Sequence, residues 1–309
     1  MNKGIHSFHI YSLYFAPRGR ERLLLMGDQL SQRHLSFNDR LIGIVGDAGS
    51  GKSLIIRGMF PGLELANDDD GVDIRKIMQV RNELEKEYTN TTYHLDMRFQ
   101  MAFTQMFEIV DFVKGALKHG RRVIIEHFDL LYPYLNINAD IIIGIGEEII
   151  VTRPNLFGPL PKDISEVVTL SLVYRKMAHT AEDLTIMILR DYYKIPLKVT
   201  NSDVRRGFVL NFTDQPVIDI YELEQKVKEL IEAQLSVSYY DESHIKIGTD
   251  IIHCTGPRIH VHNTSEIINF RLIKEIKYDH TVGMYALVGT VGERSYEDSD
   301  LNKILKEEQ

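Results

Sequence analysis

A glycine-rich segment at residues 46–53 restricts the fold of this chain more than any other feature of its sequence. Its eight residues fit the full G-x-x-x-x-G-K-[ST] pattern and read Gly46-Asp47-Ala48-Gly49-Ser50-Gly51-Lys52-Ser53. The apolar run 41–45 before the loop predicts a buried strand, and residues 54–60 after it can continue as a helix. Further strand patterns at 140–145 and 148–152 extend the alternation of strands and helices. We therefore expect an α/β domain with a parallel, three-layer sheet.

The residue types of this loop predict ATP and Mg²⁺ as its ligands. Glycines allow backbone N–H groups to surround a polyphosphate, and the start of the following helix adds a positive dipole. Lys52 would reach the β- and γ-phosphates, and the Ser53 hydroxyl would ligate Mg²⁺. A guanine-reading Asn-Lys-x-Asp segment is absent from the sequence, which favours ATP over GTP. The alternative is a glycine-rich turn that precedes a helix and binds no ligand.

The composition predicts a two-domain, cytoplasmic protein. Its 309 residues, 44% hydrophobic and 26% charged, suffice for two ordinary globular domains. The net charge of −8 does not attract nucleic acid, so we expect no DNA partner, and a tRNA contact would need a local basic patch. The single cysteine excludes a disulfide within the chain and fits a reducing compartment. We expect no membrane contact, because no apolar run reaches 18 residues and the N-terminus lacks a signal-peptide pattern.

A strand pattern that ends in acids supplies the candidate catalytic carboxylates. The run Arg121–Asp129 is apolar and rich in β-formers until its last residues. Across from a phosphate-binding loop, such a strand presents a carboxylate that polarises Mg²⁺ or positions water. We assign this role to Glu126 or Asp129, with Lys52 as the catalytic cation on the phosphates. The alternative is that these acids only close a parallel strand.

A long helix is predicted before that strand, over residues 97–119. Phe99, Phe103 and Phe107 recur along it at helical spacing. We therefore expect these three aromatic side chains to lie in the core.

Three prolines between 153 and 161 mark the predicted domain boundary. We expect a nucleotide-binding domain over 1–158 and a second domain over 159–309. The second half predicts a long helix, a strand and an amphipathic helix, followed by several short strands, which is an α+β pattern. The long helix is expected over 164–193, the strand over 207–212 and the amphipathic helix over 220–235.

Four potential zinc ligands occur in two segments of the second half. His179 and Asp183 are four residues apart on the predicted long helix, so both project from one face. Cys254 and His260 lie on a turn after a strand, and together the four could form a tetrahedral site. His253 could replace His260, but the alternation of side chains along a strand turns it away from its neighbour Cys254. The alternative is a surface His and Asp on the helix, and one buried Cys.

The segments around these four residues resemble the second additional domain of alanyl-tRNA synthetase, which threonyl-tRNA synthetase and free-standing alanyl-tRNA editing proteins share. The resemblance covers roughly residues 175–290. The H-T-A-x-H-L segment of that family is similar to residues 179–184, with Asp183 in place of the second His. Its C-G-G-T-H-V-x-N-T-G-E-I signature is similar to residues 254–267, with two residues inserted between Cys254 and His260.

The resemblance implies an aminoacyl-tRNA-editing-like domain in which zinc polarises a water or holds the substrate. Its partner would be tRNA or an amino-acid-like ligand, and the reaction would be hydrolysis of the ester of a mischarged aminoacyl-tRNA. The four zinc ligands would be His179, Asp183, Cys254 and His260. The whole chain is similar to P-loop proteins that carry this synthetase-like domain, and this resemblance implies an NTPase, a deacylase or both. Two alternatives remain: a small-molecule kinase whose second domain only recognises the substrate, and a non-catalytic regulator that responds to the nucleotide.

Overall fold

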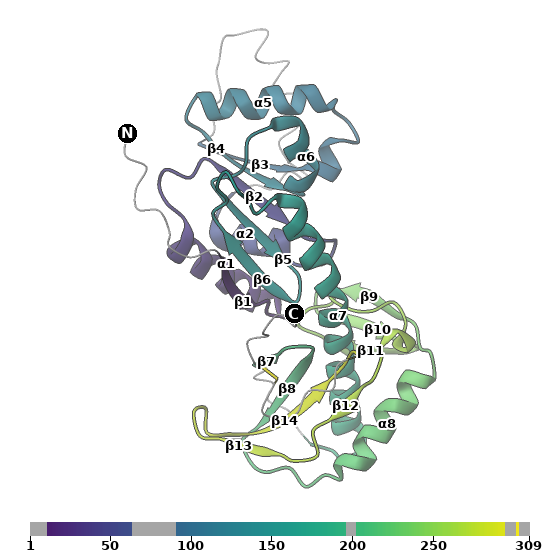
Figure 1. The fold of residues 1–309 in the computed structure, drawn as a ribbon. Coiled ribbons are helices and arrows are strands. Elements are labelled where there is room, and N and C mark those ends of the chain that lie inside the picture. Colours follow the sequence, from purple (N-terminus) through teal and green to yellow (C-terminus); the bar gives the residue numbers. More distant parts are fainter. Residues whose placement is uncertain (1–10, 64–90, 196–201, 294–300, 303–309) are drawn as a thin grey trace. The chain divides into compact units, whose positions relative to one another are not determined.

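The computed structural model describes residues 11–63, 91–195, 202–293 and 301–302 (Figure 1). The chain forms two compact units. The first consists of residues 1–16 and 20–170, and the second of residues 17–19 and 171–309. The sequence places the boundary after residue 158, whereas the units divide inside helix α7, Pro161–Asp191, after Leu170.

A six-stranded sheet forms the centre of the first unit, in the order β1-β6-β5-β2-β4-β3. Its strands are β1 Ser12–Phe15, β2 Leu41–Val45, β3 Thr92–Asp96, β4 Arg122–Glu126, β5 Ile141–Ile145 and β6 Glu148–Thr152. Strands β5, β2, β4 and β3 are parallel, which confirms the α/β class. The expectation of a parallel sheet holds for these four strands but not for β6 and β1, which run antiparallel. Only Gly146 and Glu147 separate β5 from β6, which is too short for the crossover that a parallel pair requires.

The described helices of the first unit pack on this sheet and on one another. They are α1 Arg20–His34, α2 Lys52–Met59, α4 Met97–Gln100, α5 Met106–Lys118, α6 Phe128–Leu135 and the start of α7. Helices α1 and α2 touch closely at two glycines. A Cβ on Gly27 would lie 2.3 Å from the Ile55 carbonyl oxygen, and one on Gly58 would lie 2.1 Å from the Leu24 oxygen. Helix α1 is therefore packed directly on α2, the helix that follows the glycine-rich loop 46–53.

The single helix expected over 97–119 is divided into α4 and α5. Asp96 caps α4 by accepting hydrogen bonds from the backbone N–H groups of Arg98 and Phe99, and a turn follows. A new helix then begins after Gln105 with a capping box. Because of this interruption Phe99, Phe103 and Phe107 do not enter the core, and they are 41%, 54% and 61% exposed. The expectation that they are core residues is wrong.

The second unit combines the C-terminal part of α7 and helix α8, Ile220–Glu232, with two antiparallel sheets. One sheet has the order β12-β14-β8-β7, with β13 paired to β14, and the other has the order β11-β10-β9. Their strands are β7 Ser202–Val204, β8 Gly207–Phe212, β9 Val237–Asp241, β10 His244–Ile247, β11 Asp250–His253, β12 Arg271–Leu272, β13 Lys277–Asp279 and β14 Met284–Thr290. Buried residues of α7 such as Ala178, Ala181 and Leu184 share one core with these sheets. None of the helices in the described part of the chain is long and apolar enough to cross a lipid bilayer.

Candidate functional site

The backbone of the loop 46–53 needs its glycines. Gly46, Gly49 and Gly51 have φ values of 147°, 78° and 95°, a region that side chains other than glycine rarely adopt. A Cβ on Gly46 would also lie only 2.7 Å from the Ile145 carbonyl oxygen of β5. The loop leaves the C-terminal end of β2, and Lys52 is the first residue of α2. The local structure is the strand, loop and helix that the sequence predicts.

Lys52 is buried in this loop beside a carboxylate. Its Nζ donates a hydrogen bond to the Asp47 carbonyl oxygen at 3.0 Å and lies 3.8 Å from Glu126 Oε2. Burial lowers the pKa of Lys52, and the negative charges of Glu126 and Asp96 oppose that effect. A bound anion would add further stabilisation to the ammonium group.

Glu126 connects the loop to the neighbouring strand. It is the last residue of β4, and its Oε1 accepts a hydrogen bond from Ser53 Oγ at 3.2 Å. The same oxygen lies 3.2 Å from His94 Nε2 on β3. Burial alone would raise the pKa of Glu126, but the hydrogen bond from His94 and the charges of His94 and Lys52 outweigh it and lower the pKa. Glu126 is therefore a carboxylate at neutral pH.

Asp129, the other candidate carboxylate, lies in a different environment. The strand ends at Glu126, so Asp129 falls in the first turn of α6. In the described part of the chain its hydrogen-bond partner is Ser165 on α7, whose Oγ donates to Asp129 Oδ2 at 3.2 Å. Of the two acids, Glu126 is the one in contact with loop residues.

Four residues near the loop were missed by the sequence analysis: His94, Asp96, Arg98 and His127. His94 and Asp96 belong to β3, which pairs with β4 in parallel, so Asp96 is opposite Glu126. Arg98 Nη1 lies 3.2 Å from Asp47 Oδ1 of the loop. His127 directly follows Glu126. The alternating pattern of residues 92–96 was the signal that could have revealed β3 and its polar end.

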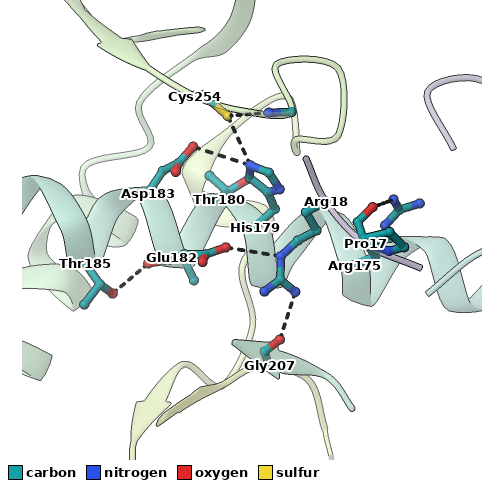
Figure 2. A network of polar contacts seen from close by, with 12 residues as sticks. Pro17, Arg18, Arg175, His179, Thr180, Glu182, Asp183, Thr185, Gly207 and Cys254 are labelled. Carbon is teal, nitrogen blue, oxygen red and sulfur yellow. Dashed lines mark hydrogen bonds and ion pairs between the residues drawn. The ribbon is translucent and has the colours of Figure 1, made fainter. Parts of the chain in front are cut away.

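A second cluster, in the second unit, brings together the four predicted metal ligands. Figure 2 shows His179 and Asp183 on helix α7 directed toward Cys254. Cys254 Sγ lies 3.1 Å from His179 Nε2 and 3.3 Å from His260 Nε2. One ligand atom from each of the four lies within 4.8 Å of the others, and all four residues are buried. His253, the alternative to His260, is exposed on the other side of the strand.

Three of the separations in this cluster, 3.3, 3.6 and 3.8 Å, fall in the range of a tetrahedral metal site, and the 3.1 Å between Cys254 Sγ and His179 Nε2 is slightly shorter. Asp183 Oδ2 lies 3.8 Å from His179 Nε2 and 3.6 Å from His260 Nε2. Zinc–ligand bonds of about 2.0–2.3 Å give a tetrahedron whose edges are roughly 3.3–3.8 Å. In the described part of the chain, Asp183 Oδ2 is buried without a hydrogen-bond partner. The cluster could therefore hold a metal ion.

The pKa shifts of the cluster residues also favour the binding of a cation. Burial raises the pKa of Asp183 well above its usual range, and the charge of Glu182 raises it further. Burial likewise raises the pKa of the Cys254 thiol and lowers the pKa of His260 to about 3. A carboxylate and a thiolate are thus costly in this site unless a positive charge joins them. A divalent cation would balance these two anions while both histidines stay neutral.

Thr180 orients His260, one of the four residues of the cluster. Its hydroxyl donates to the Lys176 carbonyl oxygen at 2.9 Å, so the same oxygen accepts from His260 Nδ1 at 3.3 Å. The His260 proton is thereby placed on Nδ1, and the Nε2 lone pair faces the cluster. Thr180 Oγ1 also accepts from the Val261 backbone N–H at 3.2 Å, which holds the loop that carries His260.

A buried ion pair supports helix α7 beside the four residues of the cluster. Arg18 Nε donates to Glu182 Oε2 at 3.1 Å, and its Nη1 donates to the Gly207 carbonyl oxygen at 3.1 Å (Figure 2). The Arg18 backbone packs against the segment 254–260, which carries Cys254 and His260. A Cβ on Gly256 in this segment would lie only 2.0 Å from the Arg18 carbonyl oxygen. Arg18 is 164 residues from Glu182 in the sequence, so no local pattern could have indicated this pair.

Comparisons with known proteins add no family to these observations. No protein-family model matches the chain, and a search of the curated proteins finds no match. The function is therefore inferred from the residues and contacts of the two clusters.

Proposed function

We propose that the chain binds ATP with Mg²⁺ at residues 46–53 and catalyses hydrolysis or transfer of the terminal phosphoryl group. One observation carries this proposal, the hydrogen bond from Ser53 Oγ to Glu126 Oε1. It places the loop hydroxyl and a strand-end carboxylate together beside Lys52. A hydroxyl, a carboxylate and a lysine around glycine-rich backbone are the groups that a triphosphate and its metal ion require.

Each residue would have a defined task in this site. The backbone N–H groups of the loop would bind phosphate oxygens, and Lys52 would neutralise charge on the β- and γ-phosphates. Ser53 and Glu126 would hold Mg²⁺ directly or through water, and Glu126 could instead orient the attacking hydroxyl or water. When bound, Mg²⁺ supplies neutralisation of the charge that develops on the phosphate oxygens.

Replacing the loop lysine tests this proposal. Lys52→Ala removes the cation that faces the phosphates, so we expect calorimetry to detect no ATP binding by the variant. The control is Lys162→Ala, because the Lys162 side chain is 80% exposed on α7. Equal ATP affinity of Lys52→Ala and the wild-type protein would refute the assignment.

We infer a second function for the second unit, metal-dependent hydrolysis of the ester of a mischarged aminoacyl-tRNA. The buried set His179, Asp183, Cys254 and His260 supports it, together with the resemblance of residues 175–290 to tRNA-synthetase editing domains. These four side chains would hold zinc. Bound zinc would act as a Lewis acid that polarises a carbonyl or a water.

Metal content and deacylation test the second function. Elemental analysis of the wild-type protein, purified without chelators, is expected to find zinc, and Cys254→Ala is expected to lose most of it. His253→Ala is the matched control, since His253 is the exposed neighbour of Cys254 and a histidine that is not part of the cluster. Hydrolysis of mischarged Ala-, Ser- or Gly-tRNA by the wild-type protein, lost in Cys254→Ala, would support editing. A wild-type protein without metal would exclude it.

The alternatives predict different reactions. A small-molecule kinase would consume ATP only when an acceptor is added, and its second unit would bind that acceptor without hydrolysing tRNA esters. A nucleotide-dependent regulator would bind ATP but show neither turnover nor deacylation. Assays of ATP consumption with and without candidate acceptors therefore separate the three functions.

A further inference from the structure

Asp47 is an acidic residue in a loop whose proposed ligand is anionic. The G-x-x-x-x-G-K-[ST] pattern leaves its position free to vary, so the motif itself does not call for an acid there. A negative charge in this loop repels the phosphates of a nucleotide. The presence of an acid at this position therefore calls for an explanation in terms of its contacts.

Three donors that suit a phosphate are bonded to Asp47. The Ala48 backbone N–H donates to Asp47 Oδ1 at 2.8 Å, and Arg98 Nη1 donates to the same oxygen at 3.2 Å. Lys52 Nζ donates to the Asp47 carbonyl oxygen at 3.0 Å. Loop N–H groups, a lysine and an arginine are the donors that bind phosphate oxygens in phosphoryl-transfer sites. The oxygens of Asp47 thus accept hydrogen bonds from the groups that a phosphate would use.

The contact with Asp47 places Arg98 at the phosphate end of the proposed site. Arg98 lies on α4, which begins directly after the C-terminal end of β3, and the last residue of β3 is paired with Glu126. Its guanidinium and the Lys52 ammonium meet at the same residue, Asp47. Because Lys52 would reach the β- and γ-phosphates, Arg98 is within side-chain reach of the same groups.

The ion pair between Arg98 and Asp47 can readily be exchanged for a ligand. The two side chains are 54% and 41% exposed, and ion pairs at such positions contribute little to stability because water and salt screen them. A phosphate carries more negative charge than a carboxylate, and the planar guanidinium can bind two of its oxygens with parallel hydrogen bonds. Arg98 would therefore bind a phosphate in preference to Asp47.

We propose that Arg98 is a phosphate-binding residue of the nucleotide site and that Asp47 is an internal substitute ligand, which holds Arg98 and the Ala48 N–H until a triphosphate replaces it. This inference rests on the proposed nucleotide site. It adds to that site a second cation besides Lys52 and a carboxylate that competes with the nucleotide. When ATP binds, the Arg98 guanidinium and the Ala48 N–H donate to phosphate oxygens and the Asp47 carboxylate is displaced.

Substitutions of the two partners are expected to change ATP affinity in opposite directions. Arg98→Ala removes a donor to the phosphates, so ATP binding, measured by calorimetry with Mg²⁺, should weaken about 10- to 100-fold, as for loss of a hydrogen bond to a charged group. Asp47→Asn keeps an oxygen for the Ala48 N–H but removes the competing charge, so ATP binding should tighten about 3- to 10-fold. Arg98→Lys keeps the positive charge and should restore part of the affinity that Arg98→Ala loses.

Arg190→Ala and Asp191→Asn are the matched controls. These residues form an ion pair at the end of α7, with side chains that are 53% and 58% exposed, and neither belongs to the loop site. Both control variants should bind ATP as the wild-type protein does. Because both ion pairs are exposed, the thermal midpoints of all these variants should stay close to that of the wild-type protein.

The outcomes separate this inference from the proposed function. If the wild-type protein does not bind ATP, both are wrong. If it binds ATP but Arg98→Ala binds ATP equally well, only the roles of Arg98 and Asp47 are wrong. A loss of affinity in both Arg98→Ala and Asp47→Asn would also overturn the inference, since it would show that the ion pair only shapes the loop. Wild-type affinity in Asp47→Asn would overturn it as well, because a competing carboxylate must weaken ATP binding.

Discussion

Ser53 Oγ and Glu126 Oε1 are 3.2 Å apart, although 73 residues separate them in the sequence. The contact follows from the sheet, because β2 and β4 are adjacent and parallel. Their C-terminal ends therefore meet at one edge, where the loop leaves β2 and Glu126 ends β4. The hydroxyl and the carboxylate that a nucleotide-bound metal ion would need are positioned before any ligand arrives.

Glu126→Gln separates the charge of this side chain from its hydrogen bonding. The amide oxygen can still accept from Ser53, but the negative charge that would hold the metal ion or orient the nucleophile is lost. We expect Mg²⁺-dependent ATP turnover to fall about 10²-fold or more, while ATP binding in the absence of Mg²⁺ persists. Phosphate release measures the first and calorimetry the second. Glu166→Gln, at a carboxylate that is 62% exposed, should behave as wild type. Full ATP turnover in Glu126→Gln would mean that another residue holds the metal ion or orients the nucleophile.

His94 is expected to act through Glu126. It is buried on β3, and its hydrogen bond to Glu126 helps to lower the pKa of that carboxylate. His94→Leu should therefore raise the pKa of Glu126 and shift the acidic limb of the turnover–pH profile to higher pH. His94→Gln keeps a donor and should restore part of the wild-type profile. A loss of turnover in His94→Leu with an unchanged pH profile would mean that His94 only fills space.

Thr180 gives a test of the metal cluster that leaves all four ligands in place. Thr180→Val removes the hydroxyl that accepts from His260 Nδ1 and from the Val261 N–H. We expect zinc affinity to fall about 10- to 100-fold, as for other residues that orient a metal ligand. Thr185→Val is a matched control, because Thr185 is equally buried on α7 and its hydroxyl bonds only to the Ala181 carbonyl oxygen among the described residues. Competition with a chromogenic chelator measures the zinc affinity of both variants. Equal zinc affinities of Thr180→Val and Thr185→Val would contradict the prediction.

Glu224 should make the stability of the second unit depend on pH. Its carboxylate accepts from the Leu272 N–H at 2.7 Å and from Lys228 Nζ at 2.7 Å, and it also contacts Lys274. Burial would raise the pKa of Glu224, but these hydrogen bonds outweigh it and lower the pKa from 4.5. The stabilisation is therefore present above pH 4.5 and is lost as the pH falls through the lower pKa of the folded protein.

Glu224→Gln measures this contribution. We expect the variant to be about 1–3 kcal/mol less stable than the wild-type protein at pH 7. The difference should shrink below pH 4.5, the ordinary pKa of this group. Urea denaturation at several pH values measures it, with Glu229→Gln, at an exposed position of the same helix, as the control. A stability difference that does not change with pH would contradict the proposed origin.

Local patterns predicted most elements of the fold because each depends on neighbouring residues. The strand 207–212 and the helix that begins at Ile220 lie where the sequence places them. The division of residues 97–119 was missed, because the aromatic spacing suggested one helix while the side chains of Asp96 and Glu108 cap two. The direction of β6 was missed as well, since hydrophobic patterns do not specify strand polarity.

The sequence by itself determined which chemical groups this protein has available: a glycine-rich loop with Lys52 and Ser53, a strand that ends in Glu126, and two pairs of potential metal ligands. Only the tertiary structure decided which of them meet. It placed Glu126 rather than Asp129 beside the loop, and it added His94 from another strand. It also brought His179 within 3.1 Å of Cys254. The physical reason is that spacing along a strand or helix is set by local geometry, whereas contacts between distant residues depend on strand order and on how the core packs.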